Sequence, residues 1–437
     1  MAHLYIAYNP VDLDPLLDIH EALRQAGVPA WYPPSQSDAS DMGLVASKIA
    51  GSFAMLVLVS ASSLRDEHIH RSAEIARAQG IKIVPFQLDR ARLVGPLKPL
   101  LATSLKHYLE DEDGQASLIE ELRARYRARC PVMAVMNLKG GVGKTTITAQ
   151  VIAALQAQAS SRVLLIDLDP QYNLTQVFFD MEDADQRAER DASVISLFEK
   201  SSLHAPGTPS PAANWTALSR EPFPLAPPEE WIHRILGDHG PPGRLDLISG
   251  QFEISKYAFA TDADGLIAIK SSFLQQIETL RGQYDLIVFD TNPNATFLTQ
   301  CALEAADRVL APMHADTYSL RGVRLLNQVI QEQVNPAIAP KLSVLFNGVQ
   351  RREQSSFEAD ARNGVFDQKA GFQLSHALLG TALPMSGHLR VKSPEEDVPA
   401  WRQLVIHHGK GGGLRPLREA LETIALDVHR LNAAVVA

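Results

Sequence analysis

The chain has 437 residues, of which 46% are hydrophobic and 21% charged, and its formal net charge is −9. This balance is typical of a soluble globular protein with two to three domains. The negative charge argues against a chain dominated by nucleic-acid affinity, although it remains compatible with a local basic patch. The two cysteines, Cys130 and Cys301, share no metal-ligand spacing, which excludes a disulfide scaffold and fits a reducing compartment.

The first twenty residues do not resemble a signal peptide, because they carry Asp12, Asp14 and Asp18. No run of about 18 apolar residues exists, and the longest apolar stretch, residues 53–59, has the length of a strand. We therefore expect no membrane span and a cytoplasmic location.

Residues 1–110 alternate between strand and helix patterns. Apolar strands are predicted at 4–8, 53–60 and 81–88, and a helix at 14–27 that ends at a glycine, as does the helical segment 73–80. Strands separated by helices predict βαβ units and a parallel sheet.

Residues 115–130 read as one helix that carries Arg123, Arg125, Arg127 and Arg129. Because successive odd positions spread around a helix, this segment is interpreted as a solvated linker helix, with a basic contact surface as the alternative. The predicted boundaries are a domain at 1–112, a linker helix at 113–130 and a second domain at 131–437.

A second α/β block starts at Pro131. A helix is predicted at 145–158, and strands are predicted at 132–137, 162–169, 285–291, 307–313 and 341–349. Residues 204–229 hold seven prolines and little periodicity, so they are expected to form a long loop or an insertion.

The stretch "KGGVGKTT", residues 139–146, lies between a predicted strand and a predicted helix. Glycines there allow backbone N–H groups to approach an anion, and the helix N-terminus adds a favourable field. Lys144 is expected to reach the β and γ phosphates and Thr145 to ligate Mg²⁺. The ordinary motif has glycine at position 138, where this chain has Leu138, so a variant with an early lysine at 139 fits instead. The predicted nucleotide-binding residues are Gly140, Gly141, Val142, Gly143, Lys144, Thr145 and Thr146.

Carboxylates follow two of the predicted strands. Asp290 ends "LIVFD", and Asp167 and Asp169 end "LLIDLD". A carboxylate at such a strand end can hold Mg²⁺ directly or through water, and a solvated strand end is the alternative for the aspartate pair.

Together, "KGGVGKTT", "VLLIDLDPQYNLT", "YDLIVFDTNP" and "VLFNGV" resemble the ParA/MinD family of deviant P-loop ATPases over residues 131–437. The resemblance implies ATP and Mg²⁺ as cofactors and an ATP-sandwich homodimer in which Lys139 serves the partner's nucleotide. It assigns the positioning of the attacking water to Asp169, the role of the other switch carboxylate to Asp167, and contact with adenine to Asn347. The predicted metal-binding residues are Thr145, Asp167 and Asp290.

Several features depart from the family pattern or stay open. Asn292 precedes Pro293 where relatives often have two prolines. The C-terminal segment lacks the basic amphipathic face of a membrane-targeting helix, so no membrane partner is expected. Arg351 and Arg352 are candidates for non-specific DNA binding, with a solvated pair as the alternative. The glycine-rich stretch 407–413 resembles a phosphate loop in composition only, and its histidines have no partners at metal-ligand spacing.

The first 110 residues resemble a TIR domain, through "YIAYNPVD", "ALRQAGVPAW", "SFAMLVLVSASSL" and "SAEIARAQGIKIVPFQLD". The resemblance implies a flavodoxin-like, doubly wound fold, and NAD⁺ hydrolysis with Glu74 as the catalytic carboxylate. An anion suits that reaction because cleavage builds positive charge on the ribose. Active relatives usually carry tryptophan four residues before the glutamate, where this chain has His70, so a non-catalytic domain is the alternative.

The sequence therefore predicts two doubly wound α/β domains, TIR-like and P-loop. The function expected first is an assembling ATPase that controls an NAD⁺-hydrolysing TIR domain in bacterial defence or stress. The alternative is a ParA-type positioning or partitioning ATPase with a non-catalytic TIR adaptor. Its expected partner is itself, and non-specific DNA or a protein trigger stays open.

Overall fold

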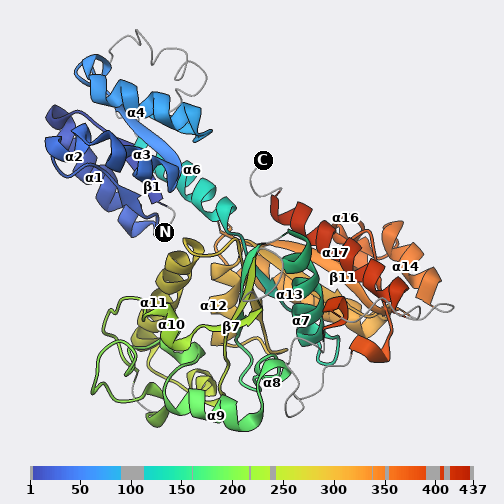
Figure 1. The fold of residues 1–437 in the computed structure, drawn as a ribbon. Helices are drawn as coiled ribbons and strands as arrows, with labels where there is room; N and C mark the ends of the chain where they lie inside the picture. The colour runs from blue at the N-terminus through green and yellow to red at the C-terminus, as the bar shows by residue number, and fades with distance from the viewer. Residues whose placement is uncertain are drawn as a thin grey trace. The chain divides into compact units, whose positions relative to one another are not determined.

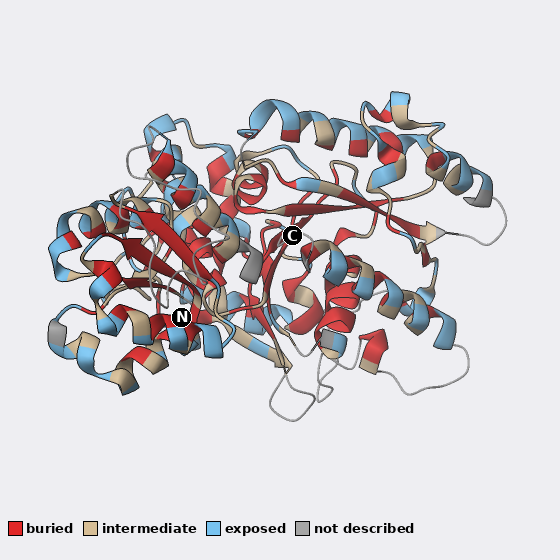
Figure 2. Ribbon diagram, turned by 90° about the horizontal axis from the view of Figure 1, so that it is seen from above, coloured by how far each residue is buried: buried red, intermediate tan, exposed pale blue. Residues whose placement is uncertain are grey.

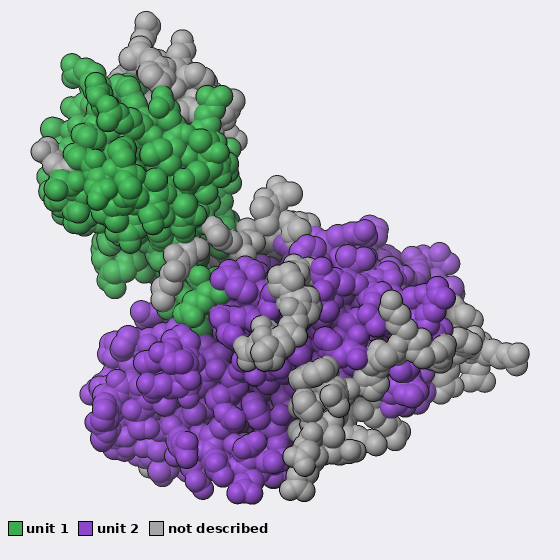
Figure 3. Space-filling model, viewed as in Figure 1, with its two compact units in different colours: residues 1–130, 278–283, 436 green, residues 131–277, 284–435, 437 purple. Residues whose placement is uncertain are grey.

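The computed structural model describes residues 3–89, 113–159, 161–215, 218–236, 243–336, 338–349, 354–389, 404–407 and 414–433. The chain divides into two compact units, which Figure 3 colours separately. Unit 1 consists of residues 1–130 with 278–283, and unit 2 of most of the remainder. Among the described residues, no helix combines the length and the hydropathy that a transmembrane span needs.

Unit 1 contains a four-stranded sheet in the order β2-β1-β3-β4, in which every neighbouring pair is parallel. The strands are β1 (His3–Ala7), β2 (Ala30–Trp31), β3 (Ser52–Val59) and β4 (Ile83–Gln87). The helices are α1 (Leu13–Gln25), α2 (Gln36–Ser40), α3 (Met42–Ala50), α4 (Glu67–Ala78) and α6 (Gly114–Arg129).

Alternation along β1 explains why helices cover both faces of this sheet. Leu4 and Ile6 belong to one apolar cluster, which includes side chains of α1 and α6. Tyr5 and Ala7 point the other way, into a cluster with α3 and α4. Successive side chains of a strand face opposite sides, so a strand that is apolar throughout must be covered twice.

Unit 2 is built on an eight-stranded sheet in the order β12-β11-β10-β5-β9-β6-β8-β7, parallel except at the β7 edge. The strands are β5 (Val132–Val135), β6 (Arg162–Asp167), β7 (His233–Leu236), β8 (Arg244–Ile248), β9 (Leu286–Asp290), β10 (Arg308–Met313), β11 (Lys341–Val349) and β12 (Leu383–Pro384). The helices are α7 (Lys144–Ala159), α8 (Thr175–Phe178), α9 (Met181–Glu189), α10 (Pro228–Trp231), α11 (Ala263–Arg281), α12 (Phe297–Ala305), α13 (Thr317–Gln333), α14 (Gln354–Arg362), α15 (Asp367–Ala370), α16 (Leu374–Ala377) and α17 (Arg415–Ala433). Figure 1 labels most of these elements.

The central strands of unit 2 are buried along their length, as Figure 2 shows in red. Val135 and Leu165 contribute to the cluster that α7 and α17 cover. Phe289 faces the other side, where its ring centroid lies 5.8 Å from that of Phe273 on α11. Unit 2 is therefore a mostly parallel α/β sheet with helices on both faces, and the carboxyl ends of its strands share one edge.

The proline-rich segment at 204–229 contains little regular structure in its described part. It holds the short 3-10 helix η4 (Pro211–Ala213) and the start of α10. Buried contacts fasten it to the 3-10 helix η5 (Phe252–Ala258), because Lys256 donates hydrogen bonds to the carbonyl oxygens of Pro211 and Asn214. The insertion is thus part of the packed unit.

Candidate nucleotide site

The loop between β5 and α7 has the backbone geometry of an anion cradle. Gly141 and Gly143 adopt positive φ values of 73° and 87°, which L side chains rarely take. A Cβ on Gly143 would lie 2.3 Å from Nδ2 of Asn347, so glycine is required there for steric reasons as well. The loop opens directly onto the first turn of α7, whose N-terminus attracts negative charge.

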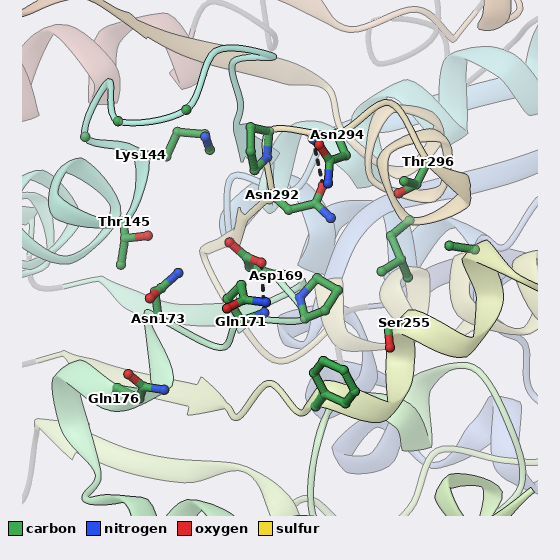
Figure 4. A pocket seen from close by; sticks show the side chains of 18 of the residues that line it. Lys144, Thr145, Asp169, Gln171, Asn173, Gln176, Ser255, Asn292, Asn294 and Thr296 are labelled. Atoms are coloured by element: carbon green, nitrogen blue, oxygen red, sulfur yellow. Dashed lines mark hydrogen bonds between the residues drawn. The ribbon is translucent and has the colours of Figure 1, made fainter. Parts of the chain in front are cut away.

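A cavity of about 1030 Å³ adjoins this loop. The predicted residues that line it are Gly140, Gly141, Gly143, Lys144, Thr145, Thr146 and Asp169. Figure 4 shows Lys144 and Thr145 on one side of the cavity and Ser255 and Thr296 on the other, with Asp169 between them. The lining does not include five other predicted site residues, namely Lys139, Val142, Asp167, Asp290 and Asn347.

Lys144 is buried within the loop, where its Nζ lies 3.5 Å from the carbonyl oxygen of Lys139. Burial lowers the pKa of Lys144, and the nearby Asp290 and Asp169 partly offset that effect. A buried ammonium group beneath an anion-binding loop suits the β and γ phosphates of a nucleotide. The negative charge of these phosphates would offset the free-energy penalty of burying the ammonium charge.

Lys139 has a different environment from Lys144. Its ammonium group lies 3.2 Å from Asp316 and 2.9 Å from the hydroxyl of Ser319, at the N-terminus of α13. Burial raises the pKa of Asp316, but hydrogen bonds from Ser319 and Lys139 outweigh it and hold that pKa below its usual value. Lys139 is therefore held by contacts within its own chain and does not line the cavity.

Asp290 lies behind Thr145. The Thr145 hydroxyl donates to one carboxylate oxygen of Asp290 at 2.7 Å, and the Thr148 hydroxyl donates to the other at 3.0 Å. Burial raises the pKa of Asp290 to about 7, against the lowering effect of these hydroxyls. Because the Thr145 hydroxyl donates a hydrogen bond to Asp290, the lone pairs of Thr145 Oγ1 remain available to a cation.

Asp167 and Asp169 lie in different environments. Asp167 is fully buried and accepts from the backbone N–H and the hydroxyl of Thr175, both at 2.8 Å. Burial, followed by the charge of Asp290, raises the pKa of Asp167 well above its usual value. Asp169 lines the cavity and accepts from the backbone N–H of Gln171, which leaves one carboxylate oxygen free of that bond.

These residues fit a magnesium ion that is held together with a nucleotide. Burial raises the pKa of both Asp167 and Asp290, and a divalent cation nearby would favour their ionised forms. Within the described part of the chain, no three His, Cys, Asp or Glu side chains form a ready-made metal site. Mg²⁺ typically keeps several waters and binds one or two carboxylates plus substrate phosphates, which matches Thr145 backed by Asp290.

Two side chains that the sequence patterns did not single out support the loop. His314 contacts the carbonyl oxygens of Asn347 at 2.8 Å and Gly141 at 3.1 Å. Asn137 accepts from the backbone N–H of Lys139 and donates to the carbonyl of Pro312. Asn347 itself donates to the carbonyl of Val142 at 2.7 Å, so its amide braces the loop. In the sequence, the signal for Asn137 and His314 is that each is a polar residue within two positions of the end of a buried strand, β5 or β10.

Other predicted residues lie elsewhere. Glu74 is exposed on α4 of unit 1, and Nε2 of His70 lies 3.0 Å from the carbonyl oxygen of Leu64. Arg351, Arg352 and residues 408–413 lie outside the described residues.

Asn292 and Pro293, which depart from the family pattern, both line the nucleotide cavity.

A mostly parallel sheet whose central strand leads through a glycine loop into a helix, with a lysine and a threonine at the helix start, defines a P-loop nucleotide-binding protein. The AAA_31 family model, described as an AAA domain, matches residues 130–344. The chromosome-partitioning ATPase Soj of Thermus thermophilus is 34% identical over 220 residues, which are 50% of this chain and 68% of that protein. The sporulation initiation inhibitor protein Soj of Bacillus subtilis is 27% identical over 212 residues, 47% of this chain and 67% of that protein.

The chain belongs to the ParA/Soj family of P-loop ATPases. Among solved structures, pNOB8 ParA has the same fold, with a TM-score of 0.50 and 21% identity over 70% of this chain and 98% of that one. The family match starts at residue 130, so residues 1–129 lie outside it.

Proposed function

We propose that this chain is a ParA-type ATPase that pairs with a second copy when it binds Mg-ATP. The observation that carries the proposal is the division between the two lysines. Lys144 lines the cavity of its own chain, whereas the ammonium group of Lys139 lies at Asp316 and Ser319. A cation that is kept out of its own site is available to a neighbour's, where it would act as an arginine finger does.

Within one site, the roles follow from position. Gly140, Gly141 and Gly143 would hold the phosphates through the loop backbone, with the Lys144 ammonium beneath them. Thr145, backed by Asp290, would hold Mg²⁺, which neutralises charge on the phosphates. Asp169 faces the cavity with one carboxylate oxygen not engaged by Gln171, and would orient the attacking water.

The role that we propose for the whole protein is positioning or partitioning, with unit 1 as an adaptor for other proteins. The name of the Thermus thermophilus relative, a chromosome-partitioning ATPase, supports partitioning. The strand order β2-β1-β3-β4 is that of the first four strands of flavodoxin-like folds, which supports the TIR assignment of unit 1. Non-specific DNA or a protein would serve as the further partner of the assembled ATPase.

Replacing the two lysines separately tests the proposal. Lys144→Ala should abolish ATP affinity, because it removes the cation beneath the phosphates. Lys139→Ala should keep ATP binding but lose ATP-driven dimerisation and slow hydrolysis on the order of 10³-fold. Nucleotide titration, light scattering and phosphate release measure these effects. Equal loss of ATP binding in both variants would contradict the assignment of the lysines to two sites.

A second candidate function is NAD⁺ hydrolysis by unit 1. The position of Glu74 supports it, because this exposed carboxylate lies on the helix that follows β3. Assembly through the ATPase would bring copies of unit 1 together and complete an NAD⁺ pocket around Glu74. Release of nicotinamide from NAD⁺ by the purified protein, with and without ATP, distinguishes this enzyme from an adaptor.

A further inference from the structure

The nucleotide cavity extends past Asp169 into a part that we call the neutral lobe, lined by Ser255, Asn292, Asn294 and Thr296. Two of these residues, Ser255 and Thr296, lie opposite Lys144 and Thr145 in Figure 4. Two hydroxyl oxygens of the lobe, Ser255 Oγ and Thr296 Oγ1, are shielded from solvent and have no hydrogen-bond partner.

Large aromatic side chains lie beside this lobe and form what we call the aromatic rim, consisting of Trp215, Phe252 and Phe259. Phe252 and Phe259 line the cavity itself, and they are 51% and 75% exposed. Trp215, from the proline-rich insertion, is 42% exposed, and its ring centroid lies 6.2 Å from that of Phe252. Exposed aromatic side chains at the edge of a polar cavity are typical of surfaces that another molecule covers.

The rim is held in place by buried charge. Lys256, between Phe252 and Phe259, is fully buried and lies 2.6 Å from Glu199. Its ammonium group also donates to the carbonyl oxygens of Pro211 and Asn214, and Asn214 directly precedes Trp215. Tyr257 donates to the same carboxylate of Glu199 at 2.9 Å. The insertion and η5 are therefore bound to each other. Because the rim is already ordered, docking of a partner would cost little conformational entropy there.

We propose that a second copy of this chain docks on the aromatic rim and the neutral lobe, so that the insertion supplies part of the ATP-dependent dimer interface. This inference rests on the proposed function. If Lys139 serves the nucleotide of another copy, that copy must approach the cavity from solvent, where it meets the exposed rings of Phe252 and Phe259. Apart from Lys144, no Lys or Arg is among the lining residues, so the lobe does not repel an incoming ammonium group.

The decisive variant is Trp215→Ala, because Trp215 belongs to the rim and does not line the nucleotide cavity. Full-length wild type and variant are loaded with a non-hydrolysable ATP analogue, and the dimer dissociation constant is measured by sedimentation. Truncation of an aromatic interface anchor should weaken the dimer at least about tenfold. The affinity of the monomer for the nucleotide should stay unchanged. Phe259→Ala should weaken the dimer similarly, and Val365→Ala, at a position 59% exposed in unit 2, is the matched control.

Each result decides the matter. If wild type binds the nucleotide but stays monomeric, the proposed function itself fails. If wild type dimerises and both rim variants dimerise as tightly, the docking surface is wrong while the dimerising ATPase stands. Loss of nucleotide affinity in Trp215→Ala, or equal weakening by Val365→Ala, would also overturn the assignment of this surface to the second copy.

Discussion

At the scale of single residues, the nucleotide site depends on which charged groups pair with each other. Lys144 and Lys139 lie five positions apart in one loop, yet only Lys144 lines the cavity of its own chain. Asp316 accounts for the difference, because it caps α13 through the backbone N–H of Ser319 and also pairs with Lys139. One carboxylate thus stabilises a helix and restrains the lysine that we assign to the partner's nucleotide.

Asp316→Asn separates these two tasks. Asparagine caps helices as well as aspartate does, so we expect the free energy of unfolding to stay within about 0.5 kcal/mol of wild type. The substitution removes the charge that holds Lys139, so the dimer should form at lower ATP concentration. Light scattering during an ATP titration measures the midpoint. An unchanged midpoint would show that the pair with Asp316 does not restrain Lys139.

The raised pKa of Asp290 predicts a pH dependence of stability. Its folded-state pKa of about 7 exceeds that of an unfolded aspartate, so the folded protein binds the proton more tightly. Stability without magnesium or nucleotide should therefore fall as pH rises from about 4 to 7, by at most about 1.4 kcal/mol per pH unit from this group. Urea unfolding in EDTA across this range should show a smaller slope for Asp290→Asn. Identical slopes in the two proteins would refute the shift.

At the scale of elements, the insertion depends on one buried ion pair. Lys256 and Glu199 have side chains that are 0% and 2% exposed, and Lys256 also satisfies two carbonyl groups of the insertion. Such a pair adds little net stability over an apolar one, but it requires both partners. The pair therefore determines where the insertion lies relative to η5.

Lys256→Met should destabilise the protein by about 3–5 kcal/mol, because it leaves the Glu199 carboxylate buried without its cation. The double variant Glu199→Gln, Lys256→Met should recover a substantial part of that loss, since no unpaired charge remains. Urea unfolding of the single and double variants gives the coupling between the two positions. A double variant no more stable than Lys256→Met would mean that the hydrogen bonds to the insertion, rather than the charge, carry the effect.

At the scale of the whole molecule, the proposal links the ATPase to unit 1 through assembly. If unit 1 hydrolyses NAD⁺, wild type with ATP should release nicotinamide. Glu74→Gln should release none while it assembles normally, because it keeps the side-chain shape and removes the charge. Lys144→Ala should release none because it does not assemble. NAD⁺ left intact by the assembled wild type would exclude the enzyme and leave unit 1 as an adaptor.

The ATPase family and much of the α/β architecture followed from local patterns in the sequence. Buried parallel strands are continuous apolar runs, so β6, β9, β10 and β11 were predicted close to their observed bounds. The glycine loop was recognisable because its chemistry is local, with glycines, Lys144 and Thr145 adjacent along the chain. Edge strands such as β7 carry no such signal, because their pattern is short and half exposed.

Tertiary structure decided whatever depends on residues far apart in the chain. The pairing of Lys139 with Asp316 spans 177 positions, and the contact of His314 with Gly141 spans 173. No local pattern encodes such contacts, since they arise when parallel strands bring their carboxyl ends to one edge of a sheet. The sequence by itself therefore determined that this chain carries a P-loop with two lysines, Lys139 and Lys144. Only the folded chain decided that Lys139 pairs with Asp316 and that the proline-rich insertion is bound to η5 through Lys256, because burial and long-range pairing exist only after folding.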